Sequence, residues 1–385
     1  MRLSVTKEDA SGMQKILAFF RGEVVLTAAL VLALLSFLLT PPSAAAFASV
    51  DVSTLCMLFA LMAVVAGLRS CGLFDWLAAG VKARVRTCRG LGFLLMSLCF
   101  FFSMVITNDV ALLTFVPFTL LLLADAGAFA LMWTVVLETI AANLGSMMTP
   151  IGNPQNLYLY MSRGLALGDF VQTLLPYALV SYILLALGTL LLPAQRRETA
   201  QESAPALARD RLLLYLVLLA VCLLSVLKVL PAWVAAVVVA LAVALRQPDL
   251  LGKVDWALLA TFLCFFVFVG NVKAAPVVSQ TLEQLLTGRE TLVAVVCSQV
   301  ISNVPATLLL APFTQNVTEL LLGVNLGGLG TLVASLASLI SFKLYGRSQG
   351  AQRGRYLLLF TVANFGLLAL LLLLVWVLGS GKNRS

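Results

Sequence analysis

The stretch GSMMTPIGNPQNLYLY (Gly145–Tyr160) decides the fold, because it places helix-breaking and polar residues between two strongly apolar runs. Pro150 and Pro154 have no backbone N–H to donate, and Gly145 and Gly152 are poor helix formers. In hydrocarbon, each unsatisfied backbone polar group costs several kcal/mol. We therefore predict a broken transmembrane helix whose gap lies against protein or a water-filled cavity. A plain kink or a loop outside the membrane is the alternative interpretation.

The composition of the whole chain predicts an all-α polytopic membrane protein. Of its 385 residues, 61% are hydrophobic and 11% are charged, whereas soluble chains carry about 25% charged residues. Apolar runs of roughly 16–22 residues recur along the sequence, which is the length that a membrane-spanning helix needs. The formal net charge is +8, but no soluble basic domain is present, so we expect no binding to nucleic acid.

The residue inventory argues against catalysis. The chain has no His, which removes His-based metal sites and Ser-His-Asp chemistry. Its seven Cys form no CxxC pair and lie mostly inside apolar runs. An intramembrane enzyme would also need a pair of acidic residues at metal-ligand spacing, and the chain has none. We therefore expect neither an enzyme nor a bound cofactor.

The apolar runs predict about nine full crossings of the membrane, at residues 24–39, 55–68, 129–160, 170–192, 212–227, 233–245, 256–270, 317–345 and 356–378. Two pairs of shorter arms, 91–106 with 110–123 and 292–301 with 306–313, predict re-entrant hairpins. This topology places 19 of the 25 Lys and Arg residues on the side of the N-terminus. Because basic residues favour the cytoplasmic side, we predict a multi-pass protein of the cytoplasmic (inner or plasma) membrane with its N-terminus inside.

Three sequence blocks recur in the same order and indicate an internal repeat. VDVSTLCMLFALMAVVAGL (residues 50–68) matches VDWALLATFLCFFVFVGNV (254–272), and ITNDVALLTFVPF (106–118) matches ISNVPATLLLAPF (301–313). NLGSMMTPIGNPQN (143–156) matches a segment beginning NLGGLGTL (325–332). Five crossings separate equivalent helices, so the second repeat is inverted. We predict a first repeat at 1–192, a linker loop with an extra transmembrane helix at 193–229, and a second repeat at 230–385.

Inverted repeats with broken helices are typical of secondary transporters. The N-terminal N–H groups of a half-helix attract anions, and carbonyls released at the break can coordinate a hard cation. The candidate substrate- and ion-binding residues therefore lie at the hairpin tips and the breaks: Thr107, Asn108, Asp109, Asn143, Gly145, Thr149, Gly152, Asn153, Asn156, Ser302, Asn303, Asn325, Gly327 and Thr331. Simple helix capping is the alternative role for the tip residues.

Two acids are candidate proton carriers. Asp109 is a carboxylate at predicted mid-depth, and carboxylates in membranes are costly and usually functional. Glu138 precedes the first break, and pairing with a basic residue is its alternative role. A sodium site is predicted at Thr107, Asn108, Ser302 and Asn303.

At these residues the chain resembles the citrate-transporter-like ion transporter superfamily. This superfamily includes divalent-anion/sodium symporters, citrate–metal transporters, arsenite permeases and sodium/proton antiporters. The matching motifs are ITNDVALLTFVP, TPIGNPQN, ISNVPATLLLAP and NLGG, and the resemblance extends over nearly the whole chain. The resemblance implies a homodimer with an inverted-repeat fold, in which scaffold and transport regions move as in an elevator.

Both tips depart from the Ser-Asn-Thr tips of the dicarboxylate branch. Asp109 would repel a dicarboxylate unless a cation intervened, and Val304 lacks the hydroxyl. We therefore expect a secondary transporter that moves a small anion, either a carboxylate or an inorganic oxyanion, coupled to Na⁺ or H⁺. The alternatives are a sodium/proton antiporter with Asp109 as the exchanging acid, an arsenite-type efflux permease, and a passive channel.

Overall fold

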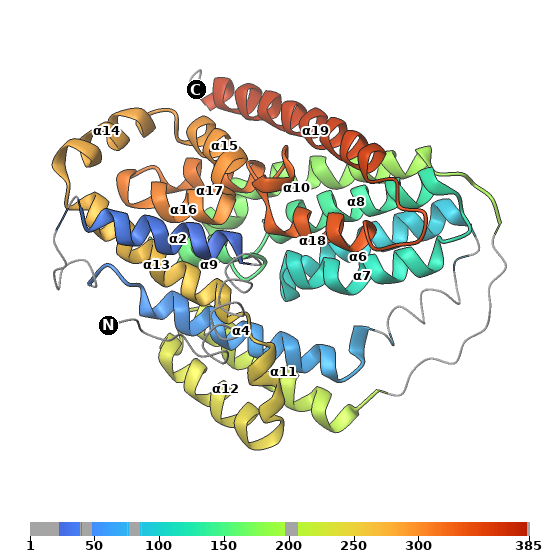
Figure 1. Ribbon diagram of the computed structural model, residues 1–385, viewed down its shortest axis with the longest axis horizontal. Helices are drawn as coiled ribbons and strands as arrows, with labels where there is room; N and C mark the ends of the chain where they lie inside the picture. Colours follow the sequence, from blue (N-terminus) through green and yellow to red (C-terminus); the bar gives the residue numbers. More distant parts are fainter. Residues whose placement is uncertain are drawn as a thin grey trace, which may run out of the picture.

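The computed structural model describes residues 23–38, 40, 48–74, 76, 85, 87–196 and 207–382. This part of the chain is helical, and its one extended contact is an isolated bridge between Thr87 and Arg196. Six of the described helices are long and apolar enough to cross a membrane. The protein is therefore an all-α polytopic membrane protein, as the composition predicts (Figure 1).

In chain order, the α-helices are α2 (Val24–Ser36), α4 (Val52–Ser70), α6 (Cys88–Ile106), α7 (Asn108–Leu122), α8 (Ala128–Ser146), α9 (Pro154–Ser162), α10 (Leu167–Gly188), α11 (Arg209–Val226), α12 (Ala232–Arg246), α13 (Trp256–Lys273), α14 (Pro276–Leu286), α15 (Glu290–Ile301), α16 (Asn303–Leu310), α17 (Val317–Leu326), α18 (Leu336–Tyr345) and α19 (Arg353–Lys382). Short 3₁₀ turns connect several of them: η1 (Thr189–Leu191), η2 (Pro248–Lys253), η3 (Ala311–Phe313) and η4 (Leu332–Ala334).

The two halves of the chain pack against each other reciprocally. Helix α2 of the first half packs along α13 of the second, and α12 of the second packs along α4 of the first. Helices α4 and α13 also begin alike, because the side chains of Asp51 and Asp255 cap them by accepting the backbone N–H of Thr54 and Leu258. These matches agree with the predicted repeat, in which α4 and α13 are equivalent.

Both predicted hairpins are present. Helices α6 and α7 form the first, towards the right of Figure 1, and α15 and α16 form the second, towards the left. The two tips share one unusual backbone conformation, with φ 73° and ψ 154° at Thr107 and φ 72° and ψ 153° at Ser302. Positive φ is rare for residues other than glycine and costs about 1–3 kcal/mol. Its occurrence at both tips shows that the repeat extends to backbone detail.

Both predicted broken helices are also present. The first consists of α8 and α9, separated by residues 147–153, which we call the first break. The second consists of α17 and α18, separated by residues 327–335, the second break, which includes η4. Each helix restarts after a polar N-cap position, Asn153 in the first half and Ser335 in the second.

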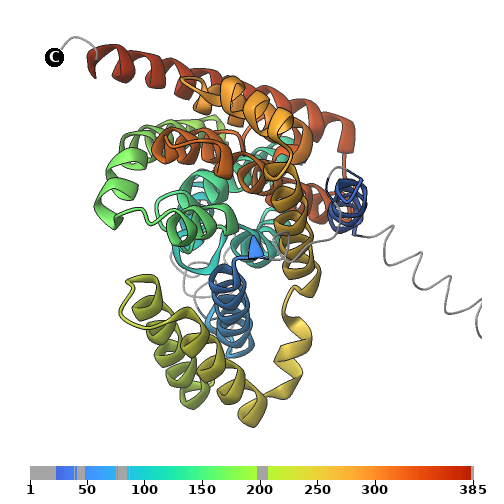
Figure 2. The same ribbon diagram turned by 90° about the vertical axis from the view of Figure 1, so that its left-hand side faces the viewer.

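The remaining helices surround this centre. Figures 1 and 2 show α4, α11 and α12 as a layer along one side of the molecule and α19 along the opposite side. Helix α6 begins at Cys88 and has 19 residues, so the first arm is longer than the predicted 91–106 and is itself long enough to span. The basic N-terminal segment 1–22 and most of the predicted linker, 197–206, lie outside the described residues. The count of nine crossings stays a prediction.

Candidate functional site

Buried amides cross-link the two broken helices at the centre of the molecule. Asn143 lies in the last turn of the first half-helix, α8. Its Oδ1 accepts from Ser335 Oγ at 2.9 Å, and its Nδ2 donates to Ser338 Oγ at 3.3 Å. Asn325 occupies the equivalent position in the second half. Its Oδ1 accepts from Asn153 Nδ2 at 3.2 Å, and its Nδ2 donates to Asn156 Oδ1 at 2.7 Å.

This pattern obeys the symmetry of the repeat. When the two NLG segments are aligned, Ser335 corresponds to Asn153 and Ser338 to Asn156. Each helix-end asparagine therefore binds the N-cap residue and the third helical residue of the opposite half. All six side chains are buried, and an unmatched buried polar group costs about 1–3 kcal/mol. The paired breaks thus form one hydrogen-bonded unit.

The first tip, Thr107–Asp109, is attached to the first break. The backbone N–H of Asn108 donates to Gly152 O at 3.1 Å, and its Nδ2 donates to Asn143 Oδ1 at 3.1 Å. Thr149 Oγ1 donates to Met104 O on the first hairpin. Gly145 permits the close approach, because a Cβ there would lie 2.0 Å from Phe100 O.

The second tip, Ser302–Val304, is attached to the second break by related contacts. Thr331 Oγ1 donates to Gln299 O at 3.1 Å, which repeats the contact between Thr149 and Met104. Ser302 Oγ donates to Ala334 O at 3.4 Å. Gly327 lies against Ser298, because a Cβ added to Gly327 would be 2.6 Å from Ser298 Oγ. Asn303 is buried, but among the described residues its side-chain amide makes no hydrogen bond equivalent to that between Asn108 and Asn143.

Backbone carbonyls released at the breaks already have donors. Asn156 Nδ2 lies within 3.2–3.4 Å of the carbonyl oxygens of Ser146, Met147 and Thr149. In the second break, Gln299 Nε2 donates to the carbonyls of Gly327 and Leu329 at 3.0 and 2.9 Å. These oxygens, which the sequence offered as cation ligands, are occupied by side-chain amides in this conformation.

A cavity of about 740 Å³ reaches the first tip and the first break. Thr107, Asp109, Asn153 and Pro154 line it from the centre of the molecule, so the starts of half-helices α7 and α9 both face it. Its other wall comes from α4, from Leu258 of α13 and from η2, and Ile340 contributes from α18. Neither Ser302 nor Asn303 is among its lining residues.

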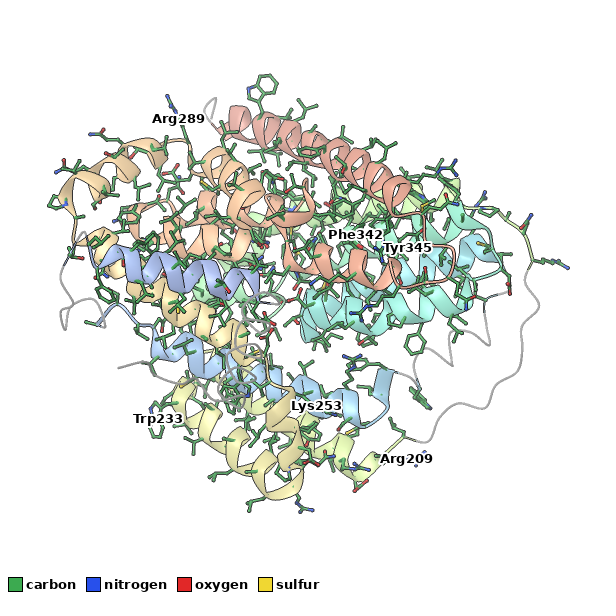
Figure 3. All side chains as sticks on the ribbon, in the orientation of Figure 1. Arg209, Trp233, Lys253, Arg289, Phe342 and Tyr345 are labelled. Carbon is green, nitrogen blue, oxygen red and sulfur yellow. The ribbon has the colours of Figure 1, made fainter. Side chains whose placement is uncertain are left out.

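Charged groups of both signs face this cavity. Arg69 and Lys253 are basic, and Glu23, Asp109 and Asp255 are acidic. Figure 3 labels Lys253 in the lower part of the view, beside α4, and Arg289 at the upper edge of the molecule. Arg69 Nη2 donates to Leu113 O at 3.2 Å, whereas no ion pair or hydrogen bond to the Asp109 carboxylate is present among the described residues. Asp109 is thus available to a ligand.

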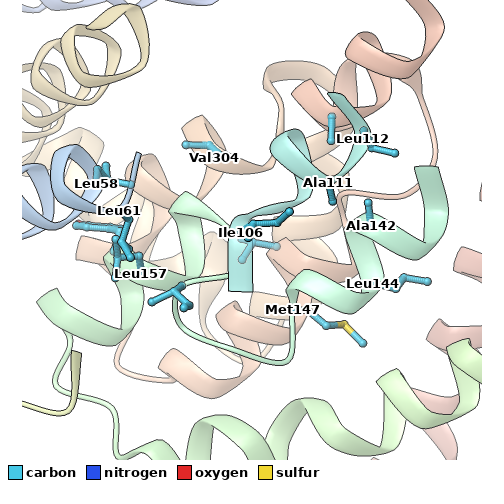
Figure 4. Close-up of a cluster of buried hydrophobic side chains, with 14 of the residues drawn as sticks. Leu58, Leu61, Ile106, Ala111, Leu112, Ala142, Leu144, Met147, Leu157 and Val304 are labelled. Atoms are coloured by element: carbon cyan, nitrogen blue, oxygen red, sulfur yellow. The ribbon is translucent and has the colours of Figure 1, made fainter. Parts of the chain in front are cut away.

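Apolar side chains also line the cavity beside the first tip. Figure 4 shows Leu58 and Leu61 of α4 close to Leu157 of α9, with Ile106 and Val304 nearby. Leu58, Leu61 and Leu157 also line the cavity. Because a low-polarity wall strengthens electrostatic interactions, a ligand at Asp109 would feel its charge more strongly than in bulk water.

Glu138 lies apart from this cavity. The side chain is fully buried in α8, and its Oε1 accepts from Thr119 Oγ1 of the first hairpin at 2.6 Å. Its Oε2 has no hydrogen-bond partner within the described part of the chain. The contact joins α7 to α8, so Glu138 holds the hairpin on the broken helix. A role in carrying protons stays a prediction.

The sequence reasoning missed four polar residues of this centre: Ser146, Gln299, Ser335 and Ser338. Ser335 and Ser338 could have been found by extending the repeat alignment six residues beyond Leu332. Gln299 gave no such signal, because its equivalent is the apolar Met104 and its partners are backbone groups. The cavity residues Arg69, Lys253 and Asp255 were also missed, because only tertiary packing brings them to the tip.

Two similar halves, two hairpin tips and two cross-linked breaks beside a polar cavity are features of membrane transporters built from repeats. A family model described as "Citrate transporter" matches residues 16–322. The chain belongs to the citrate transporter family, in agreement with the resemblance carried by its motifs.

Relatives extend this similarity over most of the chain. The inner membrane protein YbiR of Escherichia coli K12 is 32% identical over 308 residues, which cover 77% of this chain and 81% of the relative. A protein of Methanocaldococcus jannaschii named uncharacterized transporter MJ0456 is 29% identical over 320 residues, covering 81% and 86%. The silicon efflux transporter LSI3 of Oryza sativa is 34% identical over 131 residues, covering 34% and 27%. The chain is therefore a multi-pass membrane transporter.

Proposed function

We propose that this protein is a secondary active transporter that moves a small carboxylate or inorganic oxyanion, coupled to Na⁺ or H⁺. The observation that carries the proposal is the cavity at the first tip, where two half-helix starts, Thr107 and Asn153 meet the carboxylate of Asp109. Half-helix starts favour an anion, whereas the carboxylate favours a cation or a proton. The site therefore suits both ligands together.

The charge of Asp109 supplies a reason for coupling. An anion alone would be repelled by the ionised carboxylate in a site with apolar walls. A proton or Na⁺ on Asp109 removes that repulsion, so each ligand raises the affinity for the other. Such reciprocal coupling between two ligands is what thermodynamic linkage requires, and it lets a cation gradient drive the anion.

Alternating exposure of the site would follow from movement of the hydrogen-bonded centre against α4, α12 and α13. The hairpins are bonded to the breaks, and the breaks are bonded to each other, so this centre is suited to move as one body. The cavity lies along its border with α4 and α13. We expect the protein to act in the cytoplasmic membrane as a homodimer, with its N-terminus inside.

Efflux of an uncharged or weakly acidic oxygen compound is the second candidate, which corresponds to the arsenite-type alternative. The similarity to a relative named as a silicon efflux transporter supports it. The acid at the first tip also suits a substrate with less negative charge than a dicarboxylate. In this version Asp109 would exchange protons against the substrate, and flux would run outwards.

Transport into proteoliposomes that contain the purified protein tests these proposals. Citrate, succinate, sulfate, arsenite and sodium would each be offered with and without Na⁺ and pH gradients. We expect at least one anion to accumulate only when a gradient is imposed. Flux that persists unchanged after all gradients collapse would indicate a channel, and cation exchange without anion movement would indicate an antiporter.

A further inference from the structure

The second half of the molecule contains a cage of backbone carbonyls that is already filled. Gln299 Nε2 lies 3.2 Å from Val295 O, 3.0 Å from Gly327 O and 2.9 Å from Leu329 O. Its Oε1 accepts from the backbone N–H of Thr331 at 2.9 Å. The positively polarised NH₂ group thus sits among three oxygens, an arrangement that a hard cation would also satisfy.

The local chain is built around this amide. A Cβ on Gly330 would lie 2.2 Å from Gln299 Oε1, and Gly330 has φ +108°. Both the space and the backbone conformation therefore require glycine at this position. Gln299 thus fixes the second break to the second hairpin.

In the first half, the amide that lies among the released carbonyls is Asn156 Nδ2, which belongs to the broken helix itself, and the hairpin contributes no such amide. Thr149 contacts Met104 as Thr331 contacts Gln299, so Met104 is the residue at the equivalent position. A thioether has no hydrogen to donate, and the first tip has an acid, Asp109, where the second has Val304. The cavity reaches the first tip, and no residue of the second tip lines it.

We propose that the Gln299 amide is a permanent internal substitute for a cation in the second half, and that each subunit therefore binds one coupling cation, at the first tip. The inference rests on the cation coupling proposed above. Symmetry alone would give two equivalent cation sites, but only the first tip has a carboxylate, and only that tip faces the cavity. Transport would accordingly carry one cation for each substrate molecule.

The ratio of cations to substrate tests the proposal in the wild-type protein. In proteoliposomes clamped at zero membrane voltage, the ratio of internal to external substrate at which net flux stops would be measured at several fixed cation gradients, because this ratio gives the number of cations per substrate whatever the substrate's charge. One cation per substrate is expected, and two would overturn the inference. An absence of any gradient-dependent flux would instead contradict the proposed function.

A second experiment needs no transport. Asp109→Asn removes the cation site at the first tip. A second substitution, Gln299→Ala or Gln299→Met, removes the amide from the cage; methionine is chosen because Met104 occupies the equivalent position in the first half. We expect Na⁺ to raise the unfolding temperature of the double variants by about 2–4 °C over choline, because a cation can now occupy the three carbonyls. Asp109→Asn alone should show no such shift.

Gln155 provides a matched control, since it is another buried glutamine and its equivalent in the second half is Ala337. Asp109→Asn combined with Gln155→Ala should also show no Na⁺-dependent shift. Double variants at Gln299 that fold but respond to no alkali cation would overturn the inference. If neither Gln299 variant folds, the cation-to-substrate ratio of the wild-type protein decides alone.

Discussion

The two hairpin tips have the same backbone but different side chains. Thr107 and Ser302 agree within 1° in both φ and ψ, yet the next two residues are Asn-Asp in the first half and Asn-Val in the second. The first tip faces a cavity, and the second is buried in protein. The two halves therefore share the backbone conformation of the tip, whereas the side chains that could bind a ligand differ between them.

The largest expected difference in flux is between substitutions at the third residue of each tip, Asp109 in the first and Val304 in the second. Asp109→Asn should reduce gradient-driven flux by about 30- to 100-fold, because it removes a charged interaction worth about 2–3 kcal/mol. Val304→Ala, at the equivalent position, should keep flux within about threefold. Initial rates in proteoliposomes measure both. Equal losses in the two variants would mean that the halves contribute alike.

Substitution of Asn143 and substitution of Asn325 should instead destabilise the protein to the same extent. Asn143→Ala and Asn325→Ala each remove bonds to two residues of the opposite half, and each should lower the free energy of unfolding by about 2–4 kcal/mol. Denaturation in mixed micelles measures this. Ser225→Ala is a suitable control, because Ser225 Oγ is buried without a partner in the described part of the chain. A loss at only one asparagine would contradict the symmetric network.

Substitution of the glycines at the two breaks by alanine should destabilise the protein to different extents. A Cβ at Gly145 would meet the backbone oxygen of Phe100 at 2.0 Å, whereas a Cβ at Gly327 would meet the Ser298 hydroxyl at 2.6 Å. We expect Gly145→Ala to destabilise the protein by about 1–3 kcal/mol and Gly327→Ala by less. Gly366→Ala, where the space is open, should be tolerated. The reverse order in unfolding experiments would be inconsistent with the packing.

The smallest expected effect concerns the basic residues near the ends of α4 and α13. Arg69 lines the cavity, whereas the similarly placed Lys273 is exposed and does not. Arg69→Gln should raise the KM for an anionic substrate about threefold, the size of a partly screened charge interaction. Lys273→Gln should leave KM unchanged. Substrate-concentration series at two ionic strengths would show whether both residues act equally.

Much of this architecture could be predicted from local sequence. Pro150 and Pro154 specify a break because they have no backbone N–H to donate, whatever surrounds them. The tips follow from polar residues between apolar arms, and the matched blocks identify the repeat. Composition alone establishes the membrane class.

The cavity could not be predicted in this way. Asp255 is an ordinary N-cap residue in the sequence, and it becomes part of the site only because α13 packs beside the first tip. Likewise, the amides of Asn156 and Gln299 fill the released carbonyls through contacts that depend on the exact path of each break. The sequence identified which residue types gather at the centre, but not which of them satisfy one another.

The comparison of the tips can be tested by chemical access. In a background whose seven native cysteines are replaced, Thr107→Cys and Ser302→Cys would be treated with a membrane-impermeant thiol reagent from each side of the membrane separately. We predict that Thr107→Cys reacts from the side on which the cavity lies and is protected by substrate, while Ser302→Cys does not react from that side. Equal labelling of both cysteines from the same side would contradict the assignment of the transport site to the first tip.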